Sequence, residues 1–239
     1  YNTPEGIDMF FVPGTIYQTE TPLSGKIAVT EDRTGVRKLI VGGLVQSVYD
    51  SKSTKTYGVW DGFIQLAQER HETVERILIL GLGAGTSAAQ FLSVYPNAYV
   101  VGVEIEPKII EIGRRYFHLE NPRISSVCAD ASTWVKETKE KGETFDVICV
   151  DMYIGDKIPA FCESEEFLQI LPSLLVQGGS VIFNRLYYGK KKVEADAFIE
   201  KLRTLFQHID TKVVKGEGPF ENILAIVGDH LSTARTTPQ

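Results

Sequence analysis

A glycine-rich loop is the first feature of this sequence that could do chemistry. It reads Gly81-Leu82-Gly83-Ala84-Gly85 and directly follows the apolar run at residues 77–80. Glycine lets the backbone come close to a ligand, and a helix that begins after such a loop offers free N–H groups to a carboxylate or phosphate. Thr86 replaces the final glycine of the dinucleotide-binding pattern G-x-G-x-x-G, so the loop alone does not identify the ligand.

Acidic residues follow at the ends of the next predicted strands. Glu104 lies about 20 residues after the loop, where a carboxylate can accept hydrogen bonds from both hydroxyls of a ribose. Asp130 could accept a bond from the exocyclic amine of adenine while the N–H of Ala131 reaches a ring nitrogen; alternatively, Asp130 only caps the helix that begins near Ser132. Asp151 ends the fourth strand. Ligands of open α/β sheets bind outside the carboxyl ends of the strands, so the loop and these acids predict an adenosine site.

Alternating strand and helix patterns position these residues. Short apolar runs predict strands over residues 77–80, 98–103, 124–127, 145–151, 180–184, 211–215 and 223–227. Helical spacing predicts helices over residues 57–70, 85–94, 107–112, 132–141, 165–176 and 192–207. Residues 216–219 are too few for a helical crossover, so we expect the last two strands to form an antiparallel hairpin. This pattern predicts an α/β fold with a seven-stranded, mostly parallel, Rossmann-like sheet of the methyltransferase type.

The N-terminal part of the chain differs from the rest. Alternating runs at residues 26–29 and 37–45, with a turn at residues 31–35 between them, predict a β-hairpin that leads into a further strand. We expect a small N-terminal β-hairpin domain over residues 1–55 and a Rossmann-like nucleotide-binding domain over residues 56–231. Residues 232–239 lack apolar content and are expected to form a flexible tail.

Composition and charge argue against several classes of partner. The 239 residues carry a formal net charge of -6, so bulk charge would not attract nucleic acid or an anionic membrane. No apolar run approaches the ~18 residues of a membrane span. The three cysteines and four histidines show no metal-ligand spacing, so we expect no metal site. The cysteines are typical of buried residues in a reducing compartment, which predicts a cytoplasmic protein.

Several motifs resemble those of the spermidine/spermine synthase family. They are the loop at residues 81–85, the run Glu104-Ile105-Glu106-Pro107, the pair Asp130-Ala131 and the strand at residues 145–151. Residues 26–29 and 39–46 also repeat the spacing of the family pattern I-x-V … L-x-L-D-G-x-x-Q, which ends at Gln46 in this chain. The resemblance covers nearly the whole chain. It implies a class I methyltransferase sheet preceded by a small β domain, and assembly as a homodimer.

By this resemblance the chain is a transferase that binds S-adenosylmethionine (AdoMet) or decarboxylated AdoMet and acts on an amine or another small molecule. The residues expected to bind the cofactor are Gln46, Gly81, Gly83, Ala84, Gly85, Glu104, Ile105, Asp130, Ala131 and Asp151. The residues expected to be catalytic are Asp151 and Asp156, with Asp151 orienting the nucleophile or accepting its proton.

Two departures from the family pattern bear on the donor and on the attacking amine. The family loop G-G-G-D-G-G carries an acid that holds the ammonium end of the aminopropyl donor, and Ala84 stands in its place. The family pattern D-S-S-D-P has a second aspartate three residues after the first, whereas this chain has Asp151 followed by Met152-Tyr153-Ile154. A neutral loop suits the carboxylate of AdoMet, which could take N–H bonds from the backbone at residues 83–86. We therefore expect AdoMet as the donor, and methyl transfer or another AdoMet reaction.

Two alternatives stay open. The first is aminopropyl transfer from decarboxylated AdoMet, with the missing acids supplied by Asp61, Asp156 or Glu163. The second is a binding protein that keeps the nucleoside site but has lost the reaction. The discriminating feature is whether Asp151 and Asp156 point into the same cavity as the glycine loop.

Overall fold

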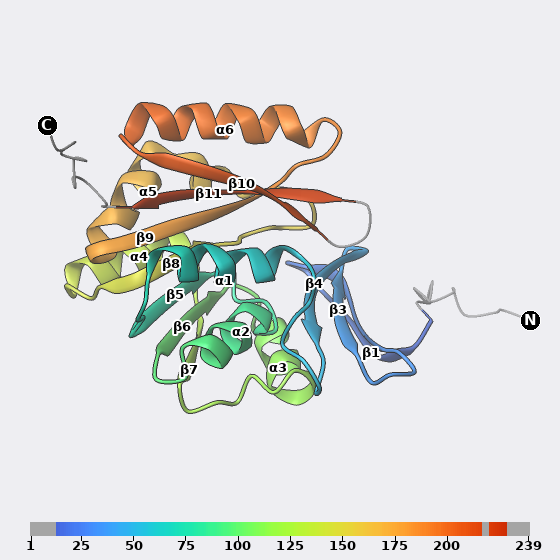
Figure 1. Ribbon diagram of the computed structural model, residues 1–239. Coiled ribbons are helices and arrows are strands. Elements are labelled where there is room, and N and C mark those ends of the chain that lie inside the picture. The colour runs from blue at the N-terminus through green and yellow to red at the C-terminus, as the bar shows by residue number, and fades with distance from the viewer. Residues whose placement is uncertain (1–12, 217–219, 229–239) are drawn as a thin grey trace, which may run out of the picture.

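Two β-sheets organise the chain in the computed structural model, which describes residues 13–216 and 220–228. The larger sheet has seven strands in the order β10-β11-β9-β8-β5-β6-β7, and the smaller one has four strands in the order β1-β2-β3-β4 (Figure 1). The strands of the larger sheet are β5 (Arg76–Leu80), β6 (Tyr99–Glu104), β7 (Ile124–Cys128), β8 (Phe145–Val150), β9 (Leu175–Leu186), β10 (Ile209–Lys215) and β11 (Glu221–Gly228). Strand β11 pairs antiparallel with both β10 and β9, so the predicted terminal hairpin is confirmed.

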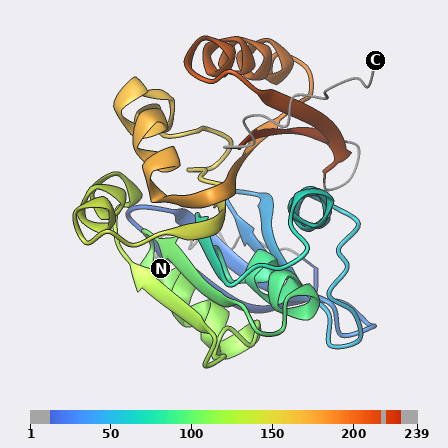
Figure 2. The same ribbon diagram turned by 60° about the vertical axis from the view of Figure 1, so that its left-hand side comes forward.

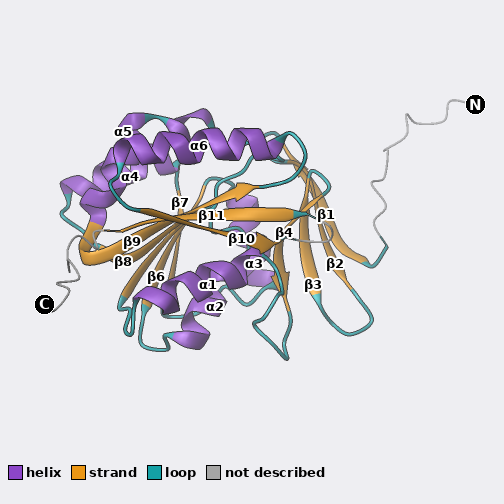
Figure 3. Ribbon diagram, turned by 45° about the horizontal axis from the view of Figure 1, so that its top comes forward, coloured by secondary structure: helices purple, strands orange, loops and turns teal. Residues whose placement is uncertain are grey.

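Helices cover both faces of the larger sheet. They are α1 (Val59–Arg70), α2 (Thr86–Val94), α3 (Pro107–Tyr116), α4 (Ala131–Glu140), α5 (Glu165–Ile170) and α6 (Lys191–Leu205). Figure 3 shows α4, α5 and α6 above the sheet and α1 and α2 below it. Figure 2 shows α6 and the terminal hairpin at the edge opposite β7. The predicted α/β fold with a seven-stranded, mostly parallel sheet is confirmed.

Strand β5 lies between β8 and β6, and after Arg76 its sequence is apolar at every position. Ile77 and Ile79 pack with α1 and α2 on one face, while Leu78 and Leu80 pack with α4 to α6 on the other. All four side chains are fully buried. A strand covered on both faces has no solvent side, so its apolar residues run continuously rather than alternating. None of the helices within the described residues is long and apolar enough to cross a membrane.

The N-terminal sheet is a four-stranded antiparallel meander of β1 (Thr15–Thr21), β2 (Gly25–Glu31), β3 (Arg37–Val41) and β4 (Leu44–Tyr49). The predicted β-hairpin leading into a further strand is confirmed by β2, β3 and β4, but the run at residues 37–45 is divided between two strands because Gly42 and Gly43 form a turn between β3 and β4. Their φ angles of 57° and 85° lie in the left-handed region that favours glycine. Strand β1 was not predicted, since its sequence TIYQTET is mostly polar and only half-buried.

The N-terminal sheet is joined to the glycine loop and to α3. Its apolar face, which includes Ile27 and Leu39, packs on Ile109 and Ile112 of α3. The Thr86 hydroxyl accepts a hydrogen bond from the N–H of Val48 at 2.8 Å and donates one to the carbonyl of Val48 at 3.0 Å. A side chain therefore links β4 to the start of α2, which explains threonine at the last position of the glycine pattern.

The segment before β9 corrects a predicted helix. The helix expected over residues 165–176 ends at Ile170 and continues only as a 3-10 turn, Leu171–Leu174, which contains Pro172. Proline has no N–H to extend an α-helix. Strand β9 then begins at Leu175, and its pairing with β8 shifts register between Phe145 and Val147. The tail expected over residues 232–239 lies outside the described residues.

Candidate active site

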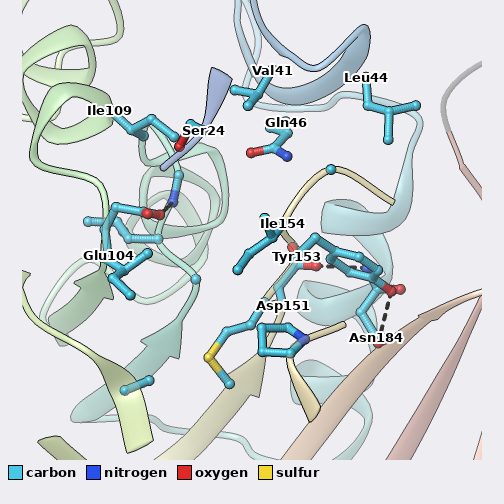
Figure 4. Close-up of a pocket in the computed structure, with 18 of the residues that line it drawn as sticks. Ser24, Val41, Leu44, Gln46, Glu104, Ile109, Asp151, Tyr153, Ile154 and Asn184 are labelled. Carbon is cyan, nitrogen blue, oxygen red and sulfur yellow. Dashed lines mark hydrogen bonds between the residues drawn. The ribbon is translucent and has the colours of Figure 1, made fainter. Parts of the chain in front are cut away.

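A cavity of about 500 Å³ lies at the carboxyl ends of the central strands, beneath β4 of the N-terminal sheet (Figure 4). The loop after β5 and the residues that end β6 and β8 line it, together with residues of α1, β9 and β11. Parallel strands present their carboxyl ends at one edge of the sheet, so side chains far apart in the sequence meet here.

The N–H groups of the glycine loop donate hydrogen bonds to other groups of the protein. Gly81 and Leu82 both donate to the carbonyl of Val103, at 2.9 and 3.0 Å, and Gly85 donates to the carbonyl of Leu82 at 3.1 Å. The Gly83 N–H donates to Oε2 of Glu104 at 2.9 Å, and the Ala84 N–H donates to Oγ of Ser47 at 2.9 Å. All five N–H groups therefore have partners within the protein.

Close approaches within the protein explain two of the loop glycines. Gly81 has a φ of 88°, and a Cβ atom there would lie 2.2 Å from the carbonyl oxygen of Asp151. Gly83 has a φ of 56°, and its Cβ would lie 2.9 Å from Oγ of Ser47. Both positions line the cavity. Glycine is needed here to bring the loop against β4 and against the end of β8.

Ala84 does not face the cavity. It is 0% exposed and belongs to the apolar cluster that joins the N-terminal sheet to Ile109, Ile112 and Phe117. Gly85 also lies outside the lining, where a Cβ would clash with Leu119. The structure therefore does not place position 84 opposite a donor's tail, as the resemblance implied.

Glu104 occupies the end of β6 and is 8% exposed. Its carboxylate accepts the N–H of Gly83 at 2.9 Å through Oε2 and the N–H of Glu106 at 3.1 Å through Oε1. Burial raises the pKa of this carboxyl, and the backbone N–H groups partly oppose that shift. The neighbouring Ile105 is 42% exposed and lines the same part of the cavity. These residues form an acidic and apolar surface beside the loop.

Asp130 both caps α4 and lines the cavity. Its Oδ1 accepts the N–H of Ser132 at 2.8 Å and the Ser132 hydroxyl at 2.6 Å, which is the capping role considered as an alternative. Both of these bonds use Oδ1, which leaves Oδ2 outside the cap. Ala131, the first residue of α4, lines the cavity beside it.

Asp151 faces the cavity just beyond the end of β8, and a chain of side-chain amides holds it. Asn222 of β11 donates to Oδ1 of Asn184 at 2.8 Å, and Asn184 of β9 donates in turn to Oδ1 of Asp151 at 2.8 Å (Figure 4). The Trp60 side chain donates a further bond. Burial raises the pKa of Asp151, and these hydrogen bonds act in the opposite direction.

Trp60, Asn184 and Asn222 belong to the site but were not predicted as site residues. Trp60 lies in the helix predicted over residues 57–70. A signal for the two asparagines existed, because each stands in an otherwise apolar strand and is 3–4% exposed. A buried amide needs hydrogen-bonding partners, and such a position indicates a polar network.

Gln46 lies at an irregularity of the N-terminal sheet. Residue Leu39 of β3 pairs with Ser47, whereas the next residue, Ile40, pairs with Val45, so Gln46 is an extra residue in β4. A bulge of this kind re-aims a side chain. Gln46 lines the cavity and stands across it from Asp151 and Tyr153 (Figure 4).

The other acids suggested for the site lie elsewhere. Asp156 is exposed, with its Oδ2 3.6 Å from Nζ of Lys191. Oε1 of Glu163 lies 3.9 Å from Nε of Arg185. The Asp61 carboxylate accepts the backbone N–H groups of residues 56 and 57. None of these three acids is part of the cavity lining, so Asp156 does not share a cavity with Asp151.

The charged side chains that line the cavity are therefore all acidic. Among the described residues that line it, Glu104, Asp130 and Asp151 are acidic, and none is lysine, arginine or histidine. Most of the remaining wall is apolar or aromatic. Such a cavity suits a ligand with positive charges and apolar parts.

Comparisons with known proteins agree with the motifs. A family model described as a methyltransferase domain matches residues 77–179. A polyamine aminopropyltransferase of Vibrio vulnificus is 34% identical over 113 residues, covering 46% of this chain and 37% of that protein. A probable polyamine aminopropyl transferase of Bifidobacterium longum is 33% identical over 153 residues, covering 64% of this chain and 33% of that protein. The chain thus spans about a third of the length of these two curated relatives.

A solved structure shares the fold. The probable spermidine synthase of Corynebacterium glutamicum superposes with a TM-score of 0.73 at 20% identity, covering 95% of this chain and 83% of that one. The predicted resemblance to the spermidine/spermine synthase family, with its class I methyltransferase-like fold, is confirmed.

Proposed function

We propose that this chain is a transferase whose donor is decarboxylated AdoMet, and that it moves an aminopropyl group from this sulfonium nucleoside to an amine. The charge of the cavity carries the proposal: three carboxylates and no basic side chain line it among the described residues. The names of the Vibrio vulnificus and Bifidobacterium longum relatives point to the same reaction.

The donor tail distinguishes the two sulfonium nucleosides. Decarboxylated AdoMet carries a sulfonium and an ammonium, whereas AdoMet adds a carboxylate that needs a cation or free N–H groups. Of the N–H groups at residues 83–86 that were expected to hold this carboxylate, those of Gly83, Ala84 and Gly85 already donate to Glu104, Ser47 and Leu82. An unpaired carboxylate beside Asp151 would also be repelled. These contacts favour decarboxylated AdoMet, against the AdoMet preference inferred from Ala84.

The nucleoside is proposed to lie over β5, β6 and β7. Glu104 would accept the ribose hydroxyls with the lone pairs that its backbone contacts leave free. Asp130 would accept the adenine amine through Oδ2, the oxygen that the α4 cap does not use. Ile105 and Ala131 would contact the base, and the sulfonium would then face Asp151 and Gln46.

Asp151 is proposed to hold the attacking amine and accept its proton. The amine nitrogen attacks the propyl carbon next to sulfur, the new C–N bond forms as the C–S bond breaks, and the electron pair stays on sulfur. Methylthioadenosine leaves as a neutral thioether. A carboxyl whose pKa is raised by burial is a stronger base than an exposed one, which suits this role.

Parallel calorimetric titrations with decarboxylated AdoMet, AdoMet and methylthioadenosine test the donor. Charge-assisted contacts are worth about 1.5–3 kcal/mol, so decarboxylated AdoMet should bind at least tenfold more tightly than AdoMet. Tighter binding of AdoMet would favour methyl transfer instead. Binding of methylthioadenosine with no turnover of either donor would favour a binding protein.

The homodimer implied by the family resemblance is part of this proposal. Light scattering should give twice the mass of one chain, and a mass equal to one chain would contradict it.

A further inference from the structure

The cavity has two halves that differ in the number of acidic side chains. The half lined by β6 and β7, the nucleoside half, holds Glu104 and Asp130. The other half, the acceptor half, lies at the ends of β8, β9 and β11 and faces β4. Its lining includes Leu44, Asp151, Ile154, Leu186, Tyr188 and Phe220. Asp151 is its only charged side chain among the described residues.

Tyr153 and Asn184, two polar side chains of the acceptor half, already have partners. The Tyr153 hydroxyl donates to the carbonyl of Asn184 at 3.2 Å and accepts the N–H of Leu186 at 3.1 Å. The Asn184 amide is engaged at both ends, by Asp151 and by Asn222. These groups hold one another and Asp151 in place, so none of them substitutes for a second charge.

Ile154 stands where a second acid would be needed. It lies three residues after Asp151, lines the cavity and is 48% exposed. Figure 4 shows its side chain between Gln46 and Asp151. A backbone bridge with Lys157 holds the turn that carries it. An apolar side chain therefore occupies the place from which a carboxylate could contact a second ammonium.

The acceptor half offers one carboxylate. Glu104 and Asp130 lie in the nucleoside half, so only Asp151 is left for the acceptor's amino group. The second ammonium of a diamine would have no carboxylate beside it and would be placed against Ile154, Leu186 and Phe220. A charge moved out of water without a partner is strongly disfavoured, whereas a methyl group at that place gains from burial.

We infer that the acceptor is a primary monoamine with an apolar tail, and not a diamine. Its single amino group contacts Asp151, and its tail contacts Ile154 and the aliphatic and aromatic wall. This inference rests on the proposed aminopropyl transfer and specifies its acceptor.

A matched pair of acceptors tests the inference. 1-Aminopentane and 1,4-diaminobutane have the same length and differ only in a terminal methyl or ammonium group. With decarboxylated AdoMet and the full chain, release of methylthioadenosine should give a kcat/KM at least tenfold higher for 1-aminopentane. An equal or higher kcat/KM for the diamine would overturn the inference and keep the proposed reaction. Release with neither amine would overturn the proposed reaction itself.

Substitution of Ile154 tests the position that carries the argument. Ile154→Asp should shift the ratio of the two kcat/KM values at least tenfold toward the diamine, because it supplies the missing carboxylate. Ile154→Asn, of matched shape but neutral, should shift this ratio much less. Ile154 is half-exposed on a turn, so both variants should fold, which circular dichroism would check. An unchanged ratio in Ile154→Asp would contradict the placement of the acceptor's tail.

Discussion

The nucleoside half and the acceptor half of the cavity are built in different ways. In the nucleoside half, Ser132 holds Asp130 from two residues further along the chain, and the backbone N–H groups of Glu106 and of Gly83 in the glycine loop hold Glu104. In the acceptor half, Asp151 is held by Asn184 and Trp60, which lie on other elements. The acids of the first half are held mainly by backbone N–H groups, and Asp151 in the second half is held by side chains of other elements.

This difference predicts where substitutions act. A nucleoside-half acid should mainly change donor binding, because its supporting backbone stays in place. An acceptor-half group should mainly change the rate, because it positions the reacting amine.

Asp151→Asn should lower kcat at least 100-fold and weaken donor binding much less, because the variant loses the proton acceptor while keeping a similar shape. Turnover and calorimetric affinity measure the two effects. Asp156→Asn is the matched control and should keep near-normal activity, since Asp156 forms a surface ion pair with Lys191. Equal losses in both variants would undermine the assignment of Asp151.

In the unmodified protein, activity should fall as the pH is lowered through the raised pKa of Asp151.

Glu104→Gln should weaken binding of decarboxylated AdoMet at least tenfold, because a charged acceptor for the ribose becomes neutral. Calorimetry measures this change directly. Glu106→Gln is a useful control: Glu106 is also buried but accepts the hydroxyl of Thr21 at 2.6 Å and lies outside the cavity lining. The control should keep its donor affinity. An affinity of Glu104→Gln equal to that of the unmodified protein would break the nucleoside-half assignment.

Asp130→Asn should have a smaller effect, a few-fold loss of donor affinity with unchanged stability. Asparagine caps a helix about as well as aspartate, so only the charge facing adenine is lost. Asp130→Ala should in addition lower the free energy of unfolding by about 1 kcal/mol through loss of the cap. Chemical denaturation separates the two roles. If Asp130→Asn binds the donor normally, Asp130 is a cap and nothing more.

The pH dependence of stability gives the smallest expected effect. Burial raises the pKa of Glu104 above its ordinary value of 4.5, so the folded protein binds this proton more tightly than the unfolded chain. Its contribution to the free energy of unfolding therefore falls as pH rises from about that ordinary value through the raised one. Glu104→Gln lacks this dependence. Its stability relative to the unmodified protein should rise with pH over that window, and a flat difference would contradict the shift.

Much of the fold could be predicted because its signals are local. The buried run at residues 77–80 and the paired strands around residues 211–227 have the patterns that their surroundings require. The helix expected over residues 165–176 failed where Pro172 and the irregular pairing of β9 with β8 compete with helical periodicity. Strand β1 failed because a polar, half-buried strand has little hydrophobic pattern.

For the site, the sequence by itself determined which strand ends carry acids, since Glu104, Asp130 and Asp151 each follow their own apolar run. Only the tertiary structure decided what those positions face. Packing places the Ala84 side chain in an apolar cluster and pairs Asp156 with Lys191. It also brings Trp60, Asn184 and Asn222 close to Asp151. The physical reason is that hydrogen bonds and burial depend on distances between elements, which the order of residues along one strand does not determine.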